Sequence, residues 1–102
     1  MATLLALYKT PANPAAFDAH YTSTHAPLAK TLPGLKSYRM SKGPVNVAAG
    51  ESPYYLVAIL EFESLAAIQT ALGTPEGKAT AGDLANFAQA GVELLMFDTQ
   101  EA

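Results

Sequence analysis

The sequence predicts an α+β domain whose segments follow the order strand, helix, strand, strand, helix, strand. A length of 102 residues is that of one domain. The strand candidates are short apolar runs with Pro or Gly residues between them. The helix candidates begin at residue types that cap helices, at Asn13, Ser64 and Thr74. This order is the ferredoxin-like pattern, in which an antiparallel four-stranded sheet carries both helices on one face.

The first half of the chain supplies a strand, a helix and a second strand. Residues 3–9 are apolar and predict the first strand. Asn13 followed by Pro14 marks the start of a helix that we expect to reach about residue 32. Pro27 interrupts this helix, so a break or kink is expected just before it. Pro and Gly at positions 33 and 34 end the helix, and residues 35–41 predict the second strand.

The second half begins with a loop over residues 42–53, which contain two Pro and two Gly. Residues 54–62 are aromatic and aliphatic without Gly or Pro, and predict the third strand. Residues 65–72 predict a helix. A further helical piece is expected to run to about residue 81, loosened at Gly77 and Gly82, with an irregular turn over 83–90. Residues 92–98 predict the last strand.

Both faces of the predicted strands are apolar. In residues 54–62, Leu56 and Leu60 alternate with Val57 and Ile59. Antiparallel strands with one face in water should instead alternate apolar and polar residues. Two helices in one layer cover one face only, so a second copy of the sheet is the simplest cover for the other. We therefore expect a homodimer, a dimeric α/β barrel with its helices outside.

Composition excludes several classes of function. The net charge is −3, and the six Lys and Arg are scattered, so no basic surface for nucleic acid is expected. The absence of Cys excludes disulfides and thiolate metal sites. No apolar stretch approaches the ~18 residues of a membrane span, and the first residues lack a basic leader. A cytoplasmic protein without a membrane partner is expected.

A tyrosine and a histidine stand four residues apart in the first predicted helix. On a helical wheel the apolar arc contains Tyr21, and His25 lies on its flank. The arc as a whole comprises Phe17, Tyr21, Thr24, Leu28 and Leu32. His25 could exchange a proton near neutral pH, and Tyr21 could orient a substrate or stabilise an oxyanion. The alternatives are a histidine that fixes the turn before Pro27 and an ordinary core tyrosine.

The chain resembles the EthD family of the dimeric α/β-barrel superfamily. The residues that carry the resemblance are Phe17, Tyr21, His25, Pro27, Leu28, Pro33, Gly34, Leu35 and Tyr38, with residues 62–65, 74–77 and 83–87. The resemblance implies two protomers and a pocket between sheet and helices in each. It also links the chain to a gene group for degradation of a fuel ether, ethyl tert-butyl ether, alongside a cytochrome P450 system. Where relatives often carry a second tyrosine this chain has His20, and where many carry an acid it has Ile59.

Related barrels include cofactor-free monooxygenases, lactone isomerases, polyketide cyclases, decarboxylases and haem-handling proteins, so the fold does not select the reaction. We expect binding of a small apolar or aromatic molecule, with His25 and Tyr21 as catalytic residues. The substrate pocket is expected to include Tyr8, Phe17, Leu28, Tyr38 and Tyr55. The alternatives are a non-catalytic accessory or carrier protein and a haem-binding barrel.

No cofactor and no metal site are expected. His20 and His25 are five residues apart, a rotation of about 140° on an α-helix, so they are not expected to share an ion. Asp18 lies two turns before His25 and is expected to serve the helix N-terminus.

Overall fold

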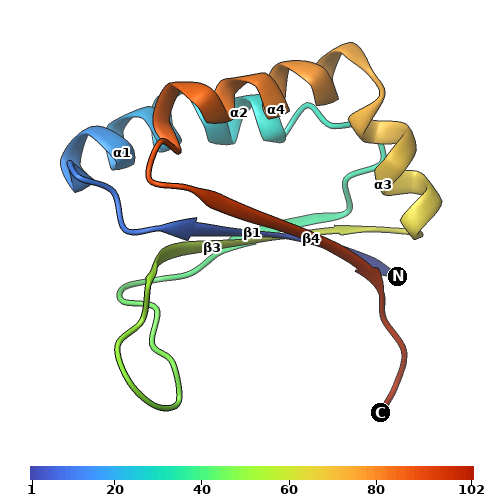
Figure 1. Cartoon of the computed structure of the whole chain (residues 1–102). Coiled ribbons are helices and arrows are strands. Elements are labelled where there is room, and N and C mark those ends of the chain that lie inside the picture. Colours follow the sequence, from blue (N-terminus) through green and yellow to red (C-terminus); the bar gives the residue numbers. More distant parts are fainter.

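A computed structural model describes residues 1–102 as one antiparallel sheet with all its helices on one side (Figure 1). The strands are β1 (Ala2–Lys9), β2 (Ser37–Met40), β3 (Tyr54–Phe62) and β4 (Val92–Asp98), in the order β2-β3-β1-β4. β1 pairs antiparallel with β3 and with β4, and β2 pairs antiparallel with β3. The ferredoxin-like α+β prediction is confirmed, and the bounds predicted for β3 and β4 match the observed ones.

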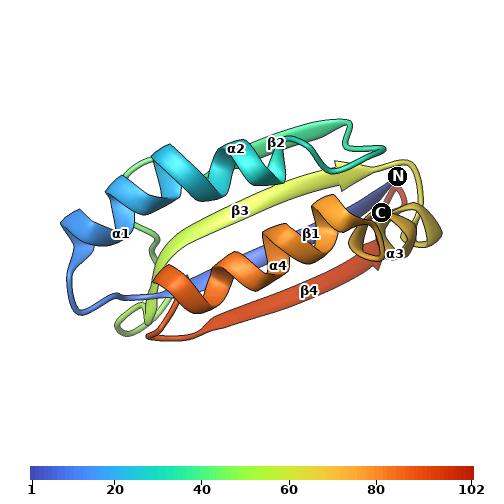
Figure 2. The ribbon, with the colours of Figure 1, turned by 90° about the horizontal axis from the view of Figure 1, so that it is seen from above.

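The helical layer has two rows. One row contains α1 (Pro14–His20), the π-helical segment η1 (Tyr21–His25) and α2 (Ala26–Ala29). The other contains α3 (Leu65–Leu72) and α4 (Pro75–Phe87). Seen from above, the first row runs along the β2 side of the sheet and α4 along the β1 and β4 side (Figure 2). The residues of the candidate site lie between these rows and the sheet.

The helices begin at the predicted caps. The side chain of Asn13 accepts a hydrogen bond from the Ala16 backbone N–H, and Ser64 and Thr74 cap α3 and α4 in the same way. The expected loosening of the second helical region is wrong, because α4 continues unbroken to Phe87. Gly77 belongs there for a packing reason. A Cβ at this position would lie 2.2 Å from the Ala71 carbonyl oxygen, so only glycine lets α4 pass so close to α3.

The irregularity expected just before Pro27 is present, and the short helix α2 follows it, but the helical row does not end there. The chain instead adds one residue to a turn, and the Ala26 N–H donates to the Tyr21 carbonyl five residues back. This shifts the buried face by one position. His25 and Ala29 are buried in place of Thr24 and Leu28, the residues that an unbroken 3.6-residue period places inward.

A bulge at the start of β3 changes a second face assignment. Leu56 pairs with Tyr8, but Tyr54 pairs with Lys9, so Tyr55 is the extra residue. Tyr54 therefore lies beneath the Lys9 ammonium on the helix-free side, whereas Tyr55 packs against Phe17 of α1. Regular alternation would place Tyr54 on the same face as Leu56, and Tyr55 on the same face as Val57. That expectation is wrong, because the bulge exchanges the faces of the two tyrosines.

The helix-free face of the sheet is apolar. Its central side chains are the half-buried Leu5, Leu7, Val57 and Ile59. On the edge strand β4, Leu95 is 47% and Phe97 41% exposed. Figure 1 shows that the loop between β2 and β3 and the C-terminal end both extend to this side. None of the helices is long and apolar enough to span a membrane.

Candidate functional site

A buried carboxylate in α4 holds two histidines of the opposite helical row. The Asp83 side chain, 6% exposed, has its oxygens 2.9 Å and 3.0 Å from His20 Nε2 and 3.0 Å from His25 Nδ1. The side-chain amide of Asn86, one turn later in α4, donates to the same carboxylate at 2.9 Å. Asp83 therefore joins α4 to the α1–η1 row. The sequence analysis did not single it out.

The π-helical segment is what brings the two histidines together. On an α-helix residues five apart point about 140° away from each other. A turn closed by an i→i+5 hydrogen bond instead stacks such residues one above the other. The expectation that His20 and His25 face different directions is therefore wrong. The Phe87 ring covers both imidazoles, with centroids 5.1 Å from His20 and 4.6 Å from His25.

His25 is bonded at both ring nitrogens. A carboxylate only accepts hydrogen bonds, so Nδ1 carries the hydrogen that Asp83 receives. Nε2 of the neutral ring is then an acceptor, and Tyr8 Oη lies 3.3 Å from it. The result is a continuous series from the Tyr8 hydroxyl through the imidazole to the Asp83 carboxylate. An acid, an imidazole and a hydroxyl in this order are arranged as in hydrolase triads, with a phenol in place of serine.

Burial sets the protonation states of this series. Desolvation lowers the pKa of His25 below its ordinary value, although the Asp83 hydrogen bond opposes the shift. Burial alone would raise the pKa of Asp83, but hydrogen bonds from Asn86, His20 and His25 outweigh it and lower the pKa. Desolvation raises the pKa of Tyr8. At neutral pH the site thus holds a neutral phenol, a neutral imidazole and a charged carboxylate.

Two further tyrosines lie close to Tyr8 and are hydrogen-bonded to each other. Tyr21 Oη of η1 and Tyr38 Oη of β2 lie 2.5 Å apart. Desolvation is the main cause that raises the pKa of both, so both hydroxyls stay protonated. The rings of Tyr8 and Tyr21 meet edge to face, with centroids 5.8 Å apart.

These polar groups border a small cavity between the sheet and the helices, here called the inner cavity. It has a volume of about 60 Å³. Its wall consists of Leu and Ala side chains together with Tyr8, Tyr21, His25, Tyr38 and Thr80. An apolar wall with a few convergent polar groups is typical of small-molecule sites.

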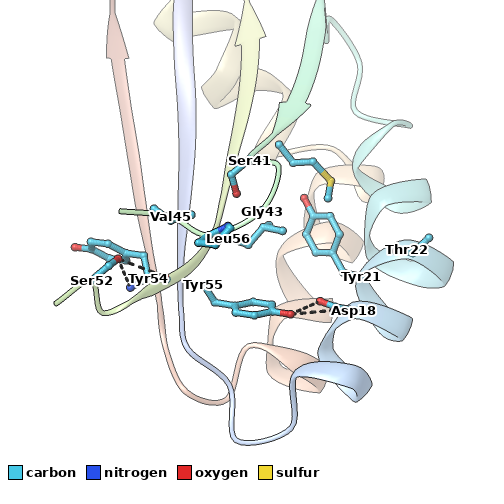
Figure 3. Close-up of a pocket in the computed structure, with 12 residues that line it drawn as sticks. Asp18, Tyr21, Thr22, Ser41, Gly43, Val45, Ser52, Tyr54, Tyr55 and Leu56 are labelled. Atoms are coloured by element: carbon cyan, nitrogen blue, oxygen red, sulfur yellow. Dashed lines mark hydrogen bonds between the residues drawn. The ribbon is translucent and has the colours of Figure 1, made fainter. Parts of the chain in front are cut away.

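A larger depression, the outer groove, lies beside it at the sheet edge where β2 ends. It has a volume of about 630 Å³ and is lined by residues of α1, η1, β3 and the 41–53 loop, among them Asp18, Tyr21, Ser41, Tyr54 and Tyr55. Figure 3 shows the Tyr55 hydroxyl directed at the Asp18 carboxylate, to which it donates at 2.9 Å. Tyr21 lines both spaces.

No Lys or Arg lines either space. Asp18 is the one charged residue of the groove, and Asp83 lies behind His25. The site therefore offers no positive partner to an anionic ligand, whose charge would lose its hydration on entry.

The structure distributes the predicted site residues as follows. The predicted pair Tyr21 and His25 lies together, with ring centroids 5.6 Å apart. Tyr8 and Tyr38 border the inner cavity with them, and Tyr55 lines the outer groove. Phe17 is a core residue between Tyr8 and Tyr55. Leu28 borders neither space, and Ala29 takes its place.

Asp83 could have been found from one signal, its position four residues before the inward Phe87 on the same helix face. Its two histidine partners are 58 and 63 positions away, and nothing local identifies them. No group of three His, Asp or Glu side chains is arranged to hold a metal ion. His25 has no free ring nitrogen to offer to a haem iron.

Comparisons with known proteins identify relatives over nearly the whole chain. The EthD domain model matches residues 9–91. An uncharacterised 11.0 kDa protein from the thcB–thcC intergenic region of Rhodococcus erythropolis is 43% identical over 95 residues, 92% of this chain and 90% of that protein. The crystal structure of an ethyl tert-butyl ether d (EthD) family protein from Bacillus halodurans C-125 is 36% identical, with a TM-score of 0.88, over 98% of this chain and 99% of that one.

More distant structures share the fold alone. SnoaB, a cofactor-independent oxygenase from Streptomyces nogalater, is 19% identical with a TM-score of 0.66, over 99% of this chain and 94% of that one. A dimeric ferredoxin-like protein of unknown function from Thermobifida fusca is 14% identical with a TM-score of 0.69, over 96% of this chain and 90% of that one.

Proposed function

Since the chain belongs to the EthD domain family, we propose that it binds a small apolar or aromatic molecule between its sheet and helices and acts on it by acid–base chemistry without a cofactor. The observation that carries this proposal is His25, held between Asp83 and Tyr8 on the wall of an apolar cavity. His25 serves as the acid or base, and Tyr21 orients the ligand. Isomerisation, cyclisation and cofactor-independent oxygenation can each begin with removal of a proton from the ligand. A decarboxylase would instead need a carboxylate ligand, for which neither space has a positively charged partner.

The ligand is uncharged. A carboxylate or phosphate would meet no Lys or Arg in either space, and Asp18 would repel it in the outer groove. The neutral phenols of Tyr21 and Tyr38 provide the hydrogen bonds that fix its orientation.

A carrier for a hydrophobic intermediate is the second candidate function. It is favoured by the internal pairing of the polar groups around the inner cavity, with no buried side-chain nitrogen or oxygen left without a partner. Such a site can hold an apolar molecule without reacting with it.

The test begins with native mass spectrometry of the protein as purified, to identify a retained small molecule. Turnover and affinity for that molecule are then measured separately in the wild type, in His25→Gln and in the control Lys30→Gln, which changes an exposed position at the end of α2. Acid–base catalysis predicts that His25→Gln loses turnover by about 10²-fold or more and retains binding. Equal turnover in all three proteins would contradict acid–base catalysis by His25. If the wild type binds the molecule without any turnover, the protein is a carrier and not an enzyme for that molecule.

The assembly proposed for this function is a homodimer through the helix-free face of the sheet. Half-buried Leu5, Leu7, Val57 and Ile59, with exposed Leu95 and Phe97, form an apolar surface that a second copy would cover. The T. fusca protein of the same fold is dimeric. A cytoplasmic location stays a prediction.

A further inference from the structure

We propose that Tyr8 Oη is the atom that takes a proton from the ligand, that Tyr8 passes its own hydrogen to His25 as it does so, and that the ligand is a neutral ketone or phenol. This inference rests on the proposed acid–base function and names its contact atom and its substrate class. Tyr8 is then the catalytic residue at the ligand, and Asp83 positions His25 behind it.

The hydrogen-bond inventory directs the ligand to Tyr8. His25 is only 5% exposed, with Nδ1 bonded to Asp83 and Nε2 facing Tyr8 Oη, so neither ring nitrogen is free for a ligand. Tyr8 Oη donates its one hydrogen to Nε2 and keeps a lone pair. Both residues border the inner cavity, and only the phenol oxygen can accept a further proton there.

The proton transfer balances without a co-reactant. A proton leaves the α-carbon of a ketone, or the hydroxyl of a phenol, for Tyr8 Oη, while the hydrogen of Tyr8 moves to His25 Nε2. The ligand becomes an enolate or phenolate, Tyr8 stays neutral, and His25 becomes an imidazolium next to the Asp83 carboxylate. Asp83 stabilises this imidazolium as the triad acid does.

The Tyr21–Tyr38 pair can donate a hydrogen bond to the oxygen of the ligand. The two phenols have two hydroxyl hydrogens, and the bond between them uses one. The other is free, and both residues border the same inner cavity as Tyr8. A neutral donor opposite the base suits an oxygen on which negative charge develops. With no Lys or Arg nearby, the charge is balanced by the new imidazolium, which requires a ligand that enters uncharged.

The test uses cyclopentanone, a small neutral ketone, in D₂O. Loss of its α-proton signal in ¹H NMR reports proton abstraction without knowledge of the natural substrate. The wild type is expected to exchange these protons faster than buffer does. Tyr8→Phe and His25→Gln are each expected to slow the enzymatic exchange by about 10²-fold or more. The double variant should be no slower than either single one, because the two groups act as a unit.

Ser23→Ala is the control, since it removes an exposed hydroxyl from the same π-helical segment. A second readout needs no substitution. His25 must be neutral to receive the proton, so the wild-type rate should fall on the acid side, with an inflexion below the ordinary histidine pKa of 6.5 because burial lowers it. The titratable groups that face His25 are Tyr8, Tyr21, Asp83 and, through Asp83, His20.

Two results would overturn the inference in different ways. Full exchange in Tyr8→Phe together with its loss in His25→Gln would show that the ligand reaches His25 directly, and would leave the proposed function standing. No exchange above buffer in the wild type would remove the ketone and phenol class, whereas turnover of the co-purified molecule would still decide the proposed function.

Discussion

Replacing Asp83 by alanine tests the centre of the site through stability. The substitution removes an acceptor shared by His20, His25 and Asn86. His25 Nδ1–H is buried, and an unsatisfied buried donor costs about 1–3 kcal/mol. His20 and Asn86 are accessible to water, which can replace the lost acceptor, so each loses only about 0.5–1.5 kcal/mol.

Part of this loss is returned, because the folded protein no longer buries a carboxylate. We therefore expect the free energy of unfolding to fall by about 2–3 kcal/mol. In a domain of this size that corresponds to a decrease in melting temperature of roughly 10–20 °C. The assay is thermal and urea unfolding followed by circular dichroism at pH 8. Protein concentration is kept constant because a dimer would make stability depend on it.

Asp18→Ala is the matched control. Asp18 is an exposed carboxylate that accepts only from the Tyr55 hydroxyl, and its removal is expected to cost about 1 kcal/mol or less. If Asp83→Ala were no more destabilising than Asp18→Ala, the carboxylate would not hold the helical rows together.

The same cluster makes the wild type sensitive to acid. The pKa of His25 is lower in the folded chain, mainly through burial, so the unfolded chain binds more protons as pH falls below about 6.5. The free energy of unfolding then decreases, by at most about 1.4 kcal/mol per pH unit. Asp83, whose pKa is also lowered, adds a loss that begins near its ordinary value of 3.8 and grows as pH falls through the folded value. In Asp83→Ala the decrease in the free energy of unfolding caused by His25 persists, and the decrease caused by Asp83 disappears. Constant wild-type stability between pH 8 and pH 5 would refute this account.

Two further substitutions test the assembly and the packing. Ile59→Lys, at the centre of the helix-free face, is expected to convert a dimer to a monomer in light scattering, because facing lysines would cost several kcal/mol. The control Glu63→Lys, at an exposed position after β3, should remain dimeric. A dimeric Ile59→Lys protein would contradict the proposed interface. Gly77→Ala is expected to lower the free energy of unfolding by about 1–3 kcal/mol, since its Cβ would lie 2.2 Å from the Ala71 carbonyl oxygen. Gly82→Ala has open space and should stabilise by about 0.4–1 kcal/mol in urea unfolding; equal effects would show that the helix corner is not tightly packed.

The strands and helix caps could be predicted because their signals are local. Pro and Gly residues bound the apolar runs that became β3 and β4, and Asn13, Ser64 and Thr74 cap the helices that follow them. The order of strands and helices also indicated correctly that all the helices lie on one face of the sheet.

The predictions of which side chains face inward failed where the backbone contains one extra residue. The wheel assumes 3.6 residues per turn throughout. One extra residue in η1 changes which residues of η1 and α2 face inward, so that Ala29 and not Leu28 lies at the cavity wall. Leu32, beyond α2, is buried as the wheel predicts. The bulge at Tyr55 does the same to one end of β3. A periodic pattern cannot predict such insertions, because tertiary contacts elsewhere in the fold stabilise them. Asp83 was missed for a different reason, since its role exists only once the helical rows meet.

Pro27 connects the deviation to the site. Its ring would collide with the carbonyl four residues earlier in a regular α-helix, at Ser23. That carbonyl lies inside η1, where the wider turn changes the position of the backbone relative to α2. The proline therefore marks the place where the helix adds a residue rather than the place where it ends. The added residue aligns His20 with His25 over Asp83 and directs His25 Nε2 to Tyr8. A regular helix of the same sequence would place these histidines on different faces. The local feature that disfavours an α-helix is thus the one that assembles the hydrogen-bonded series of Tyr8, His25 and Asp83, and π-turns of this kind occur frequently at functional sites.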